Sequence, residues 1–127
     1  HFYARSQTNN TTLMKKLFLA IVAVSALSSC NTTQPLYSWY NYEDATYQYK
    51  KKSTEELHVK MLEQYQKLIE KQKGTRGVVP PGMYSEYGYE LYKAGKKEEG
   101  LSFLKKEITL YPESEKYISR IIKQLEK

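Results

Sequence analysis

The sequence predicts an all-α protein, and three observations carry that prediction. Apolar residues recur at spacings of three and four in several segments after position 41, which is typical of helices packed on one side. Glycine and proline fall mainly between these segments, where helices end. Alternation typical of a strand occurs only in the short stretch 36–42. We therefore expect a stack of about five helices.

Before these helices, an apolar run lies near the amino terminus. Met14 is followed by two lysines and then by the apolar run 17–27, which only Ser25 interrupts. A helix needs about 20 apolar residues to span a bilayer, so this run has the length of a secretory signal and not of a membrane anchor. Residues 1–13 contain no initiator methionine. We expect them to be an upstream, non-native extension.

The apolar run ends in Leu27-Ser28-Ser29-Cys30, an aliphatic residue and two small residues before the only cysteine of the chain. This pattern resembles the lipobox of bacterial lipoproteins, in which the thiol receives diacylglycerol. We expect residues 14–29 to be a signal peptide that is cleaved between Ser29 and Cys30. Acylation of the thiol and of the freed amine would give the two or more chains that stable anchoring requires. Residues 30–40 would then be the lipidated cysteine and a tether.

The residue after the lipidated cysteine bears on the location of the protein. Asp at that place retains lipoproteins in the inner membrane of enteric-type bacteria, and this chain has Asn31. The acidic run that sends some lipoproteins to the cell surface does not follow. We therefore expect the protein to be anchored in the outer membrane of the bacterial cell envelope, facing the periplasm.

The predicted helices begin at Asn41. The first covers about 41–52 and closes with three lysines, which suit the negative end of the helix dipole. Ser53 and Glu56 form a capping box that opens the second helix, which should run to about Lys73. Its apolar stripe is predicted to contain Leu57, Met61, Tyr65 and Leu68.

Residues 74–82 contain three glycines and two prolines, and they predict a stiff, turned linker. Two further helices are expected over 83–93 and 98–111, with Gly95 ending the first of them. A last helix should follow the break at 112–114, with an apolar stripe of Tyr117, Ile118, Ile121, Ile122 and Leu125.

The second half of the chain fits the tetratricopeptide repeat, a pair of helices in 34 residues. Counted from Pro81, its size-restricted positions hold Tyr84, Tyr87, Gly88, Leu91, Gly100, Leu104 and Pro112. The small Gly88 and Gly100 should let the paired helices touch. Two departures are Gly100, where Ala is usual, and Glu107, where a small residue is expected. We predict a tetratricopeptide-like domain over 41–127 with its best repeat at 81–114, completed by flanking helices.

The lipobox and five other motifs together resemble an uncharacterised family of small bacterial outer-membrane lipoproteins with a tetratricopeptide-like domain. Those motifs are Leu36-Tyr37-Ser38-Trp39-Tyr40, Val79-Pro80-Pro81-Gly82, Glu86-Tyr87-Gly88, Ala94-Gly95 and Tyr111-Pro112-Glu113-Ser114. The resemblance implies a gene beside that of a lipoprotein similar to the curli transport pore, and it implies no catalytic activity. The family usually has Trp-Gly where this chain has Trp39-Tyr40.

Composition argues against several functions. A single cysteine allows no intrachain disulfide and no cysteine-based zinc site. His58, the only histidine after residue 29, has no neighbours at ligand spacing, and we expect it on the helix surface. We therefore predict no metal, no cofactor and no enzymatic activity. Removing residues 1–29 lowers the net charge from +6 to +3, a field too weak to indicate nucleic-acid binding in a secreted protein.

Tyrosine is abundant, with 13 in the chain. The positions that line the groove of a tetratricopeptide hairpin include Tyr89, Tyr92 and Lys93. Because aromatic side chains are enriched at interfaces, we expect these three residues and Trp39 to bind a protein partner. That partner would be the curli-pore-like lipoprotein or another envelope lipoprotein. An alternative is that the tyrosines pack against the helix that follows Ser53.

Two functions remain open from the sequence. The first is a membrane-anchored periplasmic adaptor, or assembly-accessory lipoprotein, that works with an envelope lipoprotein or pore-like complex. The second is a lipoprotein that binds a small ligand or glycan on stacking faces of tyrosine and tryptophan. A pocket that encloses a sugar ring would favour the second function, and an open, shallow groove would favour the first.

Overall fold

The computed structural model describes residues 10–22 and 34–127, and the chain divides into two compact units, His1–Thr33 and Gln34–Lys127. In the first unit a helix covers residues 10–22, and its side chains are exposed. Within the described residues, every helix falls short of the length and apolar character needed to cross a bilayer. The predicted cleavage site between Ser29 and Cys30 lies outside the described residues.

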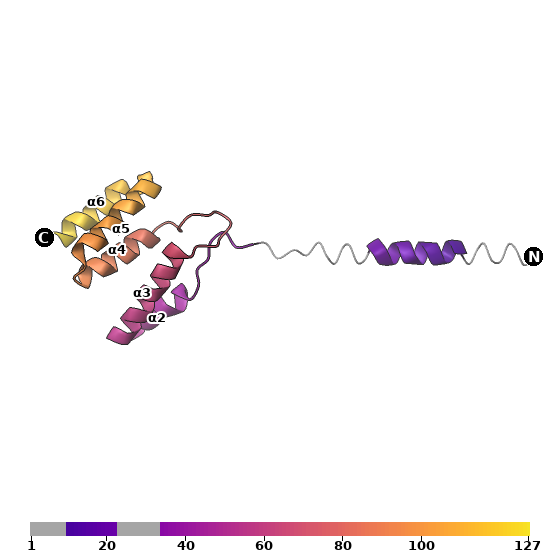
Figure 1. Ribbon diagram of the computed structural model, residues 1–127, viewed down its shortest axis with the longest axis horizontal. Helices are drawn as coiled ribbons and strands as arrows, with labels where there is room; N and C mark the ends of the chain where they lie inside the picture. Colours follow the sequence, from indigo (N-terminus) through magenta and orange to yellow (C-terminus); the bar gives the residue numbers. More distant parts are fainter. Residues whose placement is uncertain (1–9, 23–33) are drawn as a thin grey trace, which may run out of the picture. The chain divides into compact units, whose positions relative to one another are not determined.

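The second unit is a stack of five α-helices and one short 3-10 helix, which confirms the all-α prediction (Figure 1). Helices α2 and α3 form one hairpin, α4 and α5 form a second, and α6 packs on α5. In the stretch 36–42, where the sequence alternates, residues 36–41 form a loop and Tyr42 begins α2, and residues 34–127 contain no strand. The elements are α2 Tyr42–Lys51, α3 Glu55–Glu70, α4 Met83–Lys93, α5 Lys97–Leu110, η1 Pro112–Ser114 and α6 Glu115–Leu125.

Helix α3 begins at a different cap from the one predicted. The Thr54 hydroxyl accepts a hydrogen bond from the Leu57 N–H at 3.3 Å, so Thr54 and not Ser53 is the N-cap. The Ser53 hydroxyl instead donates to the Tyr49 carbonyl at 3.3 Å. The predicted capping box is therefore wrong by one residue, because Ser53 satisfies the carboxyl end of the preceding helix.

The end of α3 also differs from the prediction. The helix ends at Glu70 and not at about Lys73. Gln72 lies beyond it and donates from its side-chain amide to the Leu68 carbonyl at 3.1 Å. A side chain therefore satisfies one of the last helical carbonyls, which would otherwise lack a partner.

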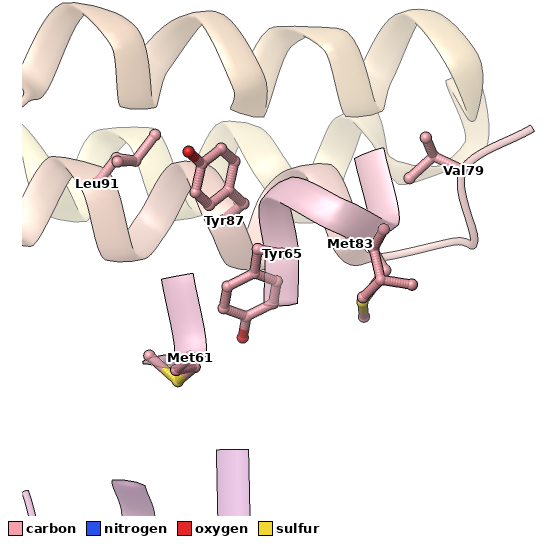
Figure 2. Packing of buried hydrophobic residues seen from close by; sticks show 7 residues of the cluster. Met61, Tyr65, Val79, Met83, Tyr87 and Leu91 are labelled. Atoms are coloured by element: carbon pink, nitrogen blue, oxygen red, sulfur yellow. The ribbon is translucent and has the colours of Figure 1, made fainter. Parts of the chain in front are cut away.

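A hydrophobic core lies between α3 and α4 (Figure 2). Leu68 is fully buried, and burying an aliphatic side chain of that size stabilises a fold by roughly 1.5–3 kcal/mol. The linker contributes to this core through Val79, whose carbonyl accepts a hydrogen bond from the Tyr111 hydroxyl at 2.6 Å. The buried members are Met61, Tyr65, Leu68, Val79, Met83, Tyr87 and Leu91.

The close helix crossing predicted at Gly88 and Gly100 is present between α4 and α5. A Cβ atom added to Gly88 would lie 2.6 Å from the Gly100 carbonyl oxygen, and one added to Gly100 would lie 2.5 Å from the Gly88 carbonyl oxygen. Both neighbours are backbone atoms, so even alanine would force the helices apart. This contact explains why glycine stands at position 100, where the repeat usually has alanine.

The second departure from the repeat, Glu107, is buried in α5 and only 2% exposed. Its Oε1 accepts a hydrogen bond from the Gly82 N–H at the start of α4, which has no side-chain cap of its own. Its Oε2 is buried without a hydrogen-bond partner. Glutamate therefore stands where the repeat has a small residue, and its carboxylate accepts a hydrogen bond at the amino end of the neighbouring helix α4.

In α6 the predicted apolar stripe is only partly correct. Ile118 is buried at 1% exposure, and the other aliphatic members are half-buried. Tyr117, by contrast, is 65% exposed. It lies next to the stripe in sequence but on the solvent side of the helix.

Candidate interaction surfaces

Three residues at the start of the second unit form what we call the N-terminal edge: Leu36, Tyr37 and Trp39. The side chain of Leu36 is 58% exposed, and that of Trp39 is 43% exposed. The Trp39 ring packs against Tyr37 with centroids 6.0 Å apart and against Tyr42 with centroids 5.7 Å apart. The exposed indole is therefore held between two tyrosine rings and has little freedom to move.

The backbone of this edge is fixed by hydrogen bonds to residues 72–76. The Thr75 N–H donates to the Pro35 carbonyl at 3.1 Å, and the Arg76 N–H donates to the Leu36 carbonyl at 3.2 Å. The Gln72 side-chain amide pairs with both backbone groups of Ser38, accepting from its N–H and donating to its carbonyl at 3.1 Å. The edge is thus part of the folded unit, although residues 34–40 were predicted to be the end of a tether.

Tyr40, which follows the edge, is the only non-glycine residue with a positive φ among the described residues, at 50°. This left-handed conformation favours glycine. Glycine is also the residue that usually follows the tryptophan in the lipoprotein family that this sequence resembles. The Tyr40 hydroxyl donates to the Lys71 carbonyl. The side chain thereby gains a contact with residues 71–76 that glycine would lack.

The aromatic contacts continue from the N-terminal edge into the core. Tyr42 meets Tyr65 edge-on with ring centroids 5.7 Å apart, and Tyr65 lies 5.8 Å from Tyr87. Tyr87 in turn lies 4.8 Å from Phe103 in α5. Tyr37 and the exposed Trp39 therefore begin a continuous chain of rings that crosses both hairpins.

The other predicted surface lies on α4, and its three residues differ in exposure. Tyr89 is 38% exposed, and the Lys93 Nζ lies 4.5 Å above its ring centroid, which is a cation–π contact. Tyr92 is half-buried because its Cβ faces the Gly100 crossing. We call Tyr89 and Lys93 the α4 surface.

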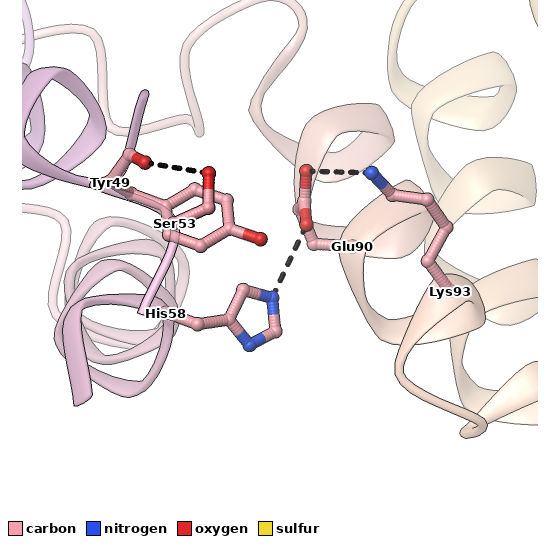
Figure 3. A network of polar contacts seen from close by, with 5 residues as sticks. All are labelled: Tyr49, Ser53, His58, Glu90 and Lys93. Atoms are coloured by element: carbon pink, nitrogen blue, oxygen red, sulfur yellow. Dashed lines mark hydrogen bonds and ion pairs between the residues drawn. The ribbon is translucent and has the colours of Figure 1, made fainter. Parts of the chain in front are cut away.

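Glu90, which follows Tyr89, contacts α3 (Figure 3). Its Oε2 lies 3.3 Å from the His58 Nε2, and its Oε1 lies 3.6 Å from the Lys93 Nζ. The His58 ring also packs on Tyr49, with centroids 5.1 Å apart. The prediction that His58 is an ordinary surface residue is therefore wrong, because its half-buried side chain links the two hairpins.

A second polar link between the hairpins joins Tyr42 and Glu86. The Tyr42 hydroxyl lies 2.8 Å from one carboxylate oxygen and 3.0 Å from the other. Burial, reinforced by the carboxylate, raises the pKa of Tyr42 well above its usual value. Burial also raises the pKa of Glu86, while the hydrogen bond from Tyr42 and the nearby Lys50 oppose that change. Sequence patterns gave no sign of this pair, which is separated by 44 residues.

Two hollows on the second unit are open to solvent. The larger, of about 430 Å³, is lined by Tyr40, Asn41, Glu43, Asp44 and Tyr47. The smaller, of about 350 Å³, lies beside the linker and includes Val79, Tyr84 and Leu110. Both are shallow and open, so neither would enclose a ligand on all sides. No cluster of three or more metal-ligating side chains occurs in the described parts of the chain.

Comparison with models of protein families identifies the family to which the chain belongs. The model of a family described as a domain of unknown function (DUF4810) matches residues 36–121. The chain belongs to the DUF4810 family. No curated protein and no solved structure matches it.

The DUF4810 match begins at Leu36, the first residue of the N-terminal edge, and ends within α6. It therefore includes both exposed aromatic surfaces and the Gly88–Gly100 crossing. Cys30 lies before the matched residues. The family description names no activity, so a function for this DUF4810 domain has to be argued from its surfaces.

Proposed function

We propose that the protein is a lipid-anchored helical adaptor of the bacterial cell envelope that holds another envelope lipoprotein or a pore-like complex. The observation that carries this proposal is the exposure of large aromatic side chains on backbone that the fold keeps rigid. Such side chains provide wide contact area at low entropy cost and dominate many protein interfaces.

The α4 surface meets this description best. Tyr89 is exposed, while the helix beneath it is fixed to α5 by the glycine crossing and to α3 by the His58–Glu90 contact. Lys93 adds a positive charge above the ring. A partner with an acidic, apolar-centred patch would complement this surface, and Tyr92 would contribute the exposed part of its ring.

Acylation of Cys30 after cleavage of residues 14–29 would supply the anchor, and Asn31 favours the periplasmic face of the outer membrane. The gene neighbourhood implied by the resemblance makes a curli-pore-like lipoprotein the first partner to test. The proposal includes no enzymatic activity, no cofactor and no nucleic-acid ligand.

A second candidate function is binding of a small ligand or glycan. The 430 Å³ hollow supports it, because two exposed tyrosines there flank the carboxylates of Glu43 and Asp44. Aromatic faces and carboxylates are the groups that stack on sugar rings and accept bonds from their hydroxyls. Its shallowness favours the adaptor as the first choice.

The test is recovery of partners from native membranes with the acylated protein and two variants. Tyr89→Ala should reduce recovery by at least about tenfold if Tyr89 is an interface anchor. Tyr117→Ala is the matched control, because Tyr117 is more exposed but lies on α6. Equal recovery by both variants and wild type, or no partner for wild type, would contradict the adaptor.

The anchor is tested separately with Cys30→Ser. The wild type should carry acyl chains in its intact mass and partition into detergent, whereas the variant should remain uncleaved or soluble. A variant that still partitions as the wild type does, with no lipid in the mass of either, would contradict the lipoprotein assignment.

A further inference from the structure

The N-terminal edge differs from the α4 surface in the charge beside it. The loop that hydrogen-bonds to the edge carries three exposed basic residues, Lys71, Lys73 and Arg76. The Arg76 guanidinium also lies 3.4 Å from the Tyr37 hydroxyl. Exposed aromatic and aliphatic side chains therefore stand directly beside a cluster of positive charge.

The nearest acidic residues in sequence belong to the helices on either side of these segments. Glu43 and Asp44, in the first turn of α2, line the hollow between Tyr40 and Tyr47. Glu70 precedes the basic loop at the end of α3. The surface made by Leu36, Trp39, Lys73 and Arg76 contains none of these carboxylates.

The length of the chain before the edge limits how far it can lie from an anchor. Gln34, the first residue of the second unit, follows Cys30 by four positions. An extended chain spans at most about 3.6 Å per residue, so these four residues reach no more than about 14 Å. That reach is about twice the depth of one headgroup region, which is roughly 5–7 Å, so the edge can lie within this region but not far beyond it.

We infer that the N-terminal edge and its basic loop form a membrane-contacting face that lies in the headgroup region of an anionic leaflet. This inference rests on the proposed acylation of Cys30. Tryptophan and tyrosine favour the membrane interface, where their rings meet both apolar and polar groups. Lysine and arginine are drawn to anionic headgroups. Leu36 supplies an aliphatic side chain at the end nearest the anchor.

This face orients the domain as well as binding lipid. With Trp39 in the interface, the anchor and the edge hold the second unit at two points instead of one. The unit then cannot rotate freely about its short connection. The α4 surface would be presented to a partner in a fixed direction.

The experiment uses the fact that Trp39 is the only tryptophan in the chain. The acylated protein is reconstituted in phosphatidylethanolamine–phosphatidylglycerol vesicles, with and without lipids brominated near the glycerol end of the acyl chain. Bromine quenches an indole only at short range, so the fluorescence of a Trp39 in the interface should be clearly lower in the brominated vesicles than in the unbrominated ones. Acrylamide in the water should quench it weakly.

The matched control moves the reporter to the α4 surface with Trp39→Phe combined with Tyr89→Trp. This variant keeps an aromatic ring at both places, and its fluorescence should be quenched by acrylamide and not by the brominated lipids. A second variant, Lys73→Gln with Arg76→Gln, should lower the docked fraction of Trp39. Each basic residue near an anionic surface favours the bound state by about fivefold. Replacing phosphatidylglycerol with phosphatidylcholine should act in the same direction.

The inference is overturned if an acylated protein shows Trp39 open to acrylamide and insensitive to the brominated lipids. It is also overturned if Trp39 becomes protected only when a protein partner is added, since the edge would then be a protein interface. An intact mass without acyl chains contradicts the proposed anchor itself. Failure of the Tyr89→Ala recovery experiment contradicts the adaptor alone, so the three failures are distinguishable.

Discussion

Helix α4 has two interfaces in the second unit, one with α5 and one with the α2–α3 hairpin, and the two are built differently. Helices α4 and α5 meet backbone to backbone at Gly88 and Gly100, where no side chain intervenes. The α2–α3 hairpin meets α4 partly through polar side chains, as in the Tyr42–Glu86 and His58–Glu90 contacts. One interface is therefore specified by the absence of side chains, and the other includes contacts that can be removed singly. Substitution of either glycine should therefore be more damaging than removal of one of these polar contacts.

The largest effect is expected for Gly88→Leu. The new side chain would meet the backbone of Gly100 and Leu104, which cannot move without separating α4 from α5. Overpacking of this kind costs typically 1–3 kcal/mol, and a backbone clash places Gly88→Leu at or above about 3 kcal/mol. Chemical denaturation monitored by circular dichroism measures the change.

Ser102→Leu is the matched control, because Ser102 is an exposed residue of α5. It should change the free energy of unfolding by less than about 0.5 kcal/mol. Equal stability of Gly88→Leu and wild type would show that the glycine crossing does not hold this hairpin together.

A smaller effect, of about 2 kcal/mol, is expected for Glu107→Ala. The substitution leaves the half-buried Gly82 N–H without its acceptor and opens a cavity beside α5. Thermal or chemical unfolding would measure it. A loss below about 0.5 kcal/mol would indicate that water replaces the carboxylate, so that the contact adds little to the α4–α5 hairpin.

The buried Glu107 should also make the free energy of unfolding depend on pH. Burial raises its pKa in the folded state, while the Gly82 N–H and the Ser85 hydroxyl oppose the change. The folded protein then binds this proton more tightly than the unfolded chain does. Stability should therefore fall as pH rises from the ordinary glutamate pKa through the raised value, and should level off above it.

Glu107→Gln should reduce this decline, because an amide does not titrate. Glu86, whose pKa is also raised by burial, would account for part of the remainder. Unfolding free energies measured between pH 4 and pH 7 provide the comparison. An unchanged slope in the variant would exclude Glu107 as its source.

In the polar interface, Tyr42→Phe should cost about 1–2 kcal/mol. It keeps the ring packing against Trp39 and Tyr65 but removes the hydrogen bond to the half-buried Glu86 carboxylate. Tyr47→Phe is the control, since Tyr47 is on the same helix and 58% exposed. If the two variants unfold at the same denaturant concentration, the Tyr42–Glu86 contact does not stabilise the packing of the hairpins.

The smallest effect is expected for Tyr40→Gly. Glycine relieves the left-handed backbone at φ 50°, but it loses the hydrogen bond to Lys71 and gains flexibility in the unfolded chain. These effects should cancel to within about 0.5 kcal/mol. The same substitution in helix α2, Tyr47→Gly, should cost about 1 kcal/mol. If the melting temperature falls equally for both variants, position 40 does not accept glycine better than a helical position does.

Much of the fold could be predicted because its signals are local. The predicted bounds of α4, 83–93, agree with the structure, since Gly82 and Gly95 mark its ends. The repeat template alone predicts the Gly88–Gly100 crossing that the structure shows. Local signals place a helix end within a turn, which is why the α3 cap was missed by one residue and its end by three.

Contacts between distant residues were not predictable in this way. His58 carries no periodic signal that points to Glu90, and Ser38 carries none that points to Gln72. Each pair depends on how two separate segments are brought together. Trp39 and Tyr89 are exposed, whereas Tyr92 is half-buried and less available than its place in the repeat indicated; partner binding by these residues stays a prediction. Acylation of Cys30 stays a prediction.

The pairing of Gln72 with Ser38 has a mechanical consequence. One side-chain amide engages both the N–H and the carbonyl of a single residue, as a neighbouring strand would, and Pro35 and Leu36 are joined to the same loop by backbone bonds. Tension applied at the amino end would be carried by these bonds into the turn after α3 and from there into the helix. The hydrogen bonds between residues 35–38 and residues 72–76 would break first, and the five helices that follow residue 41 would remain folded while these bonds opened.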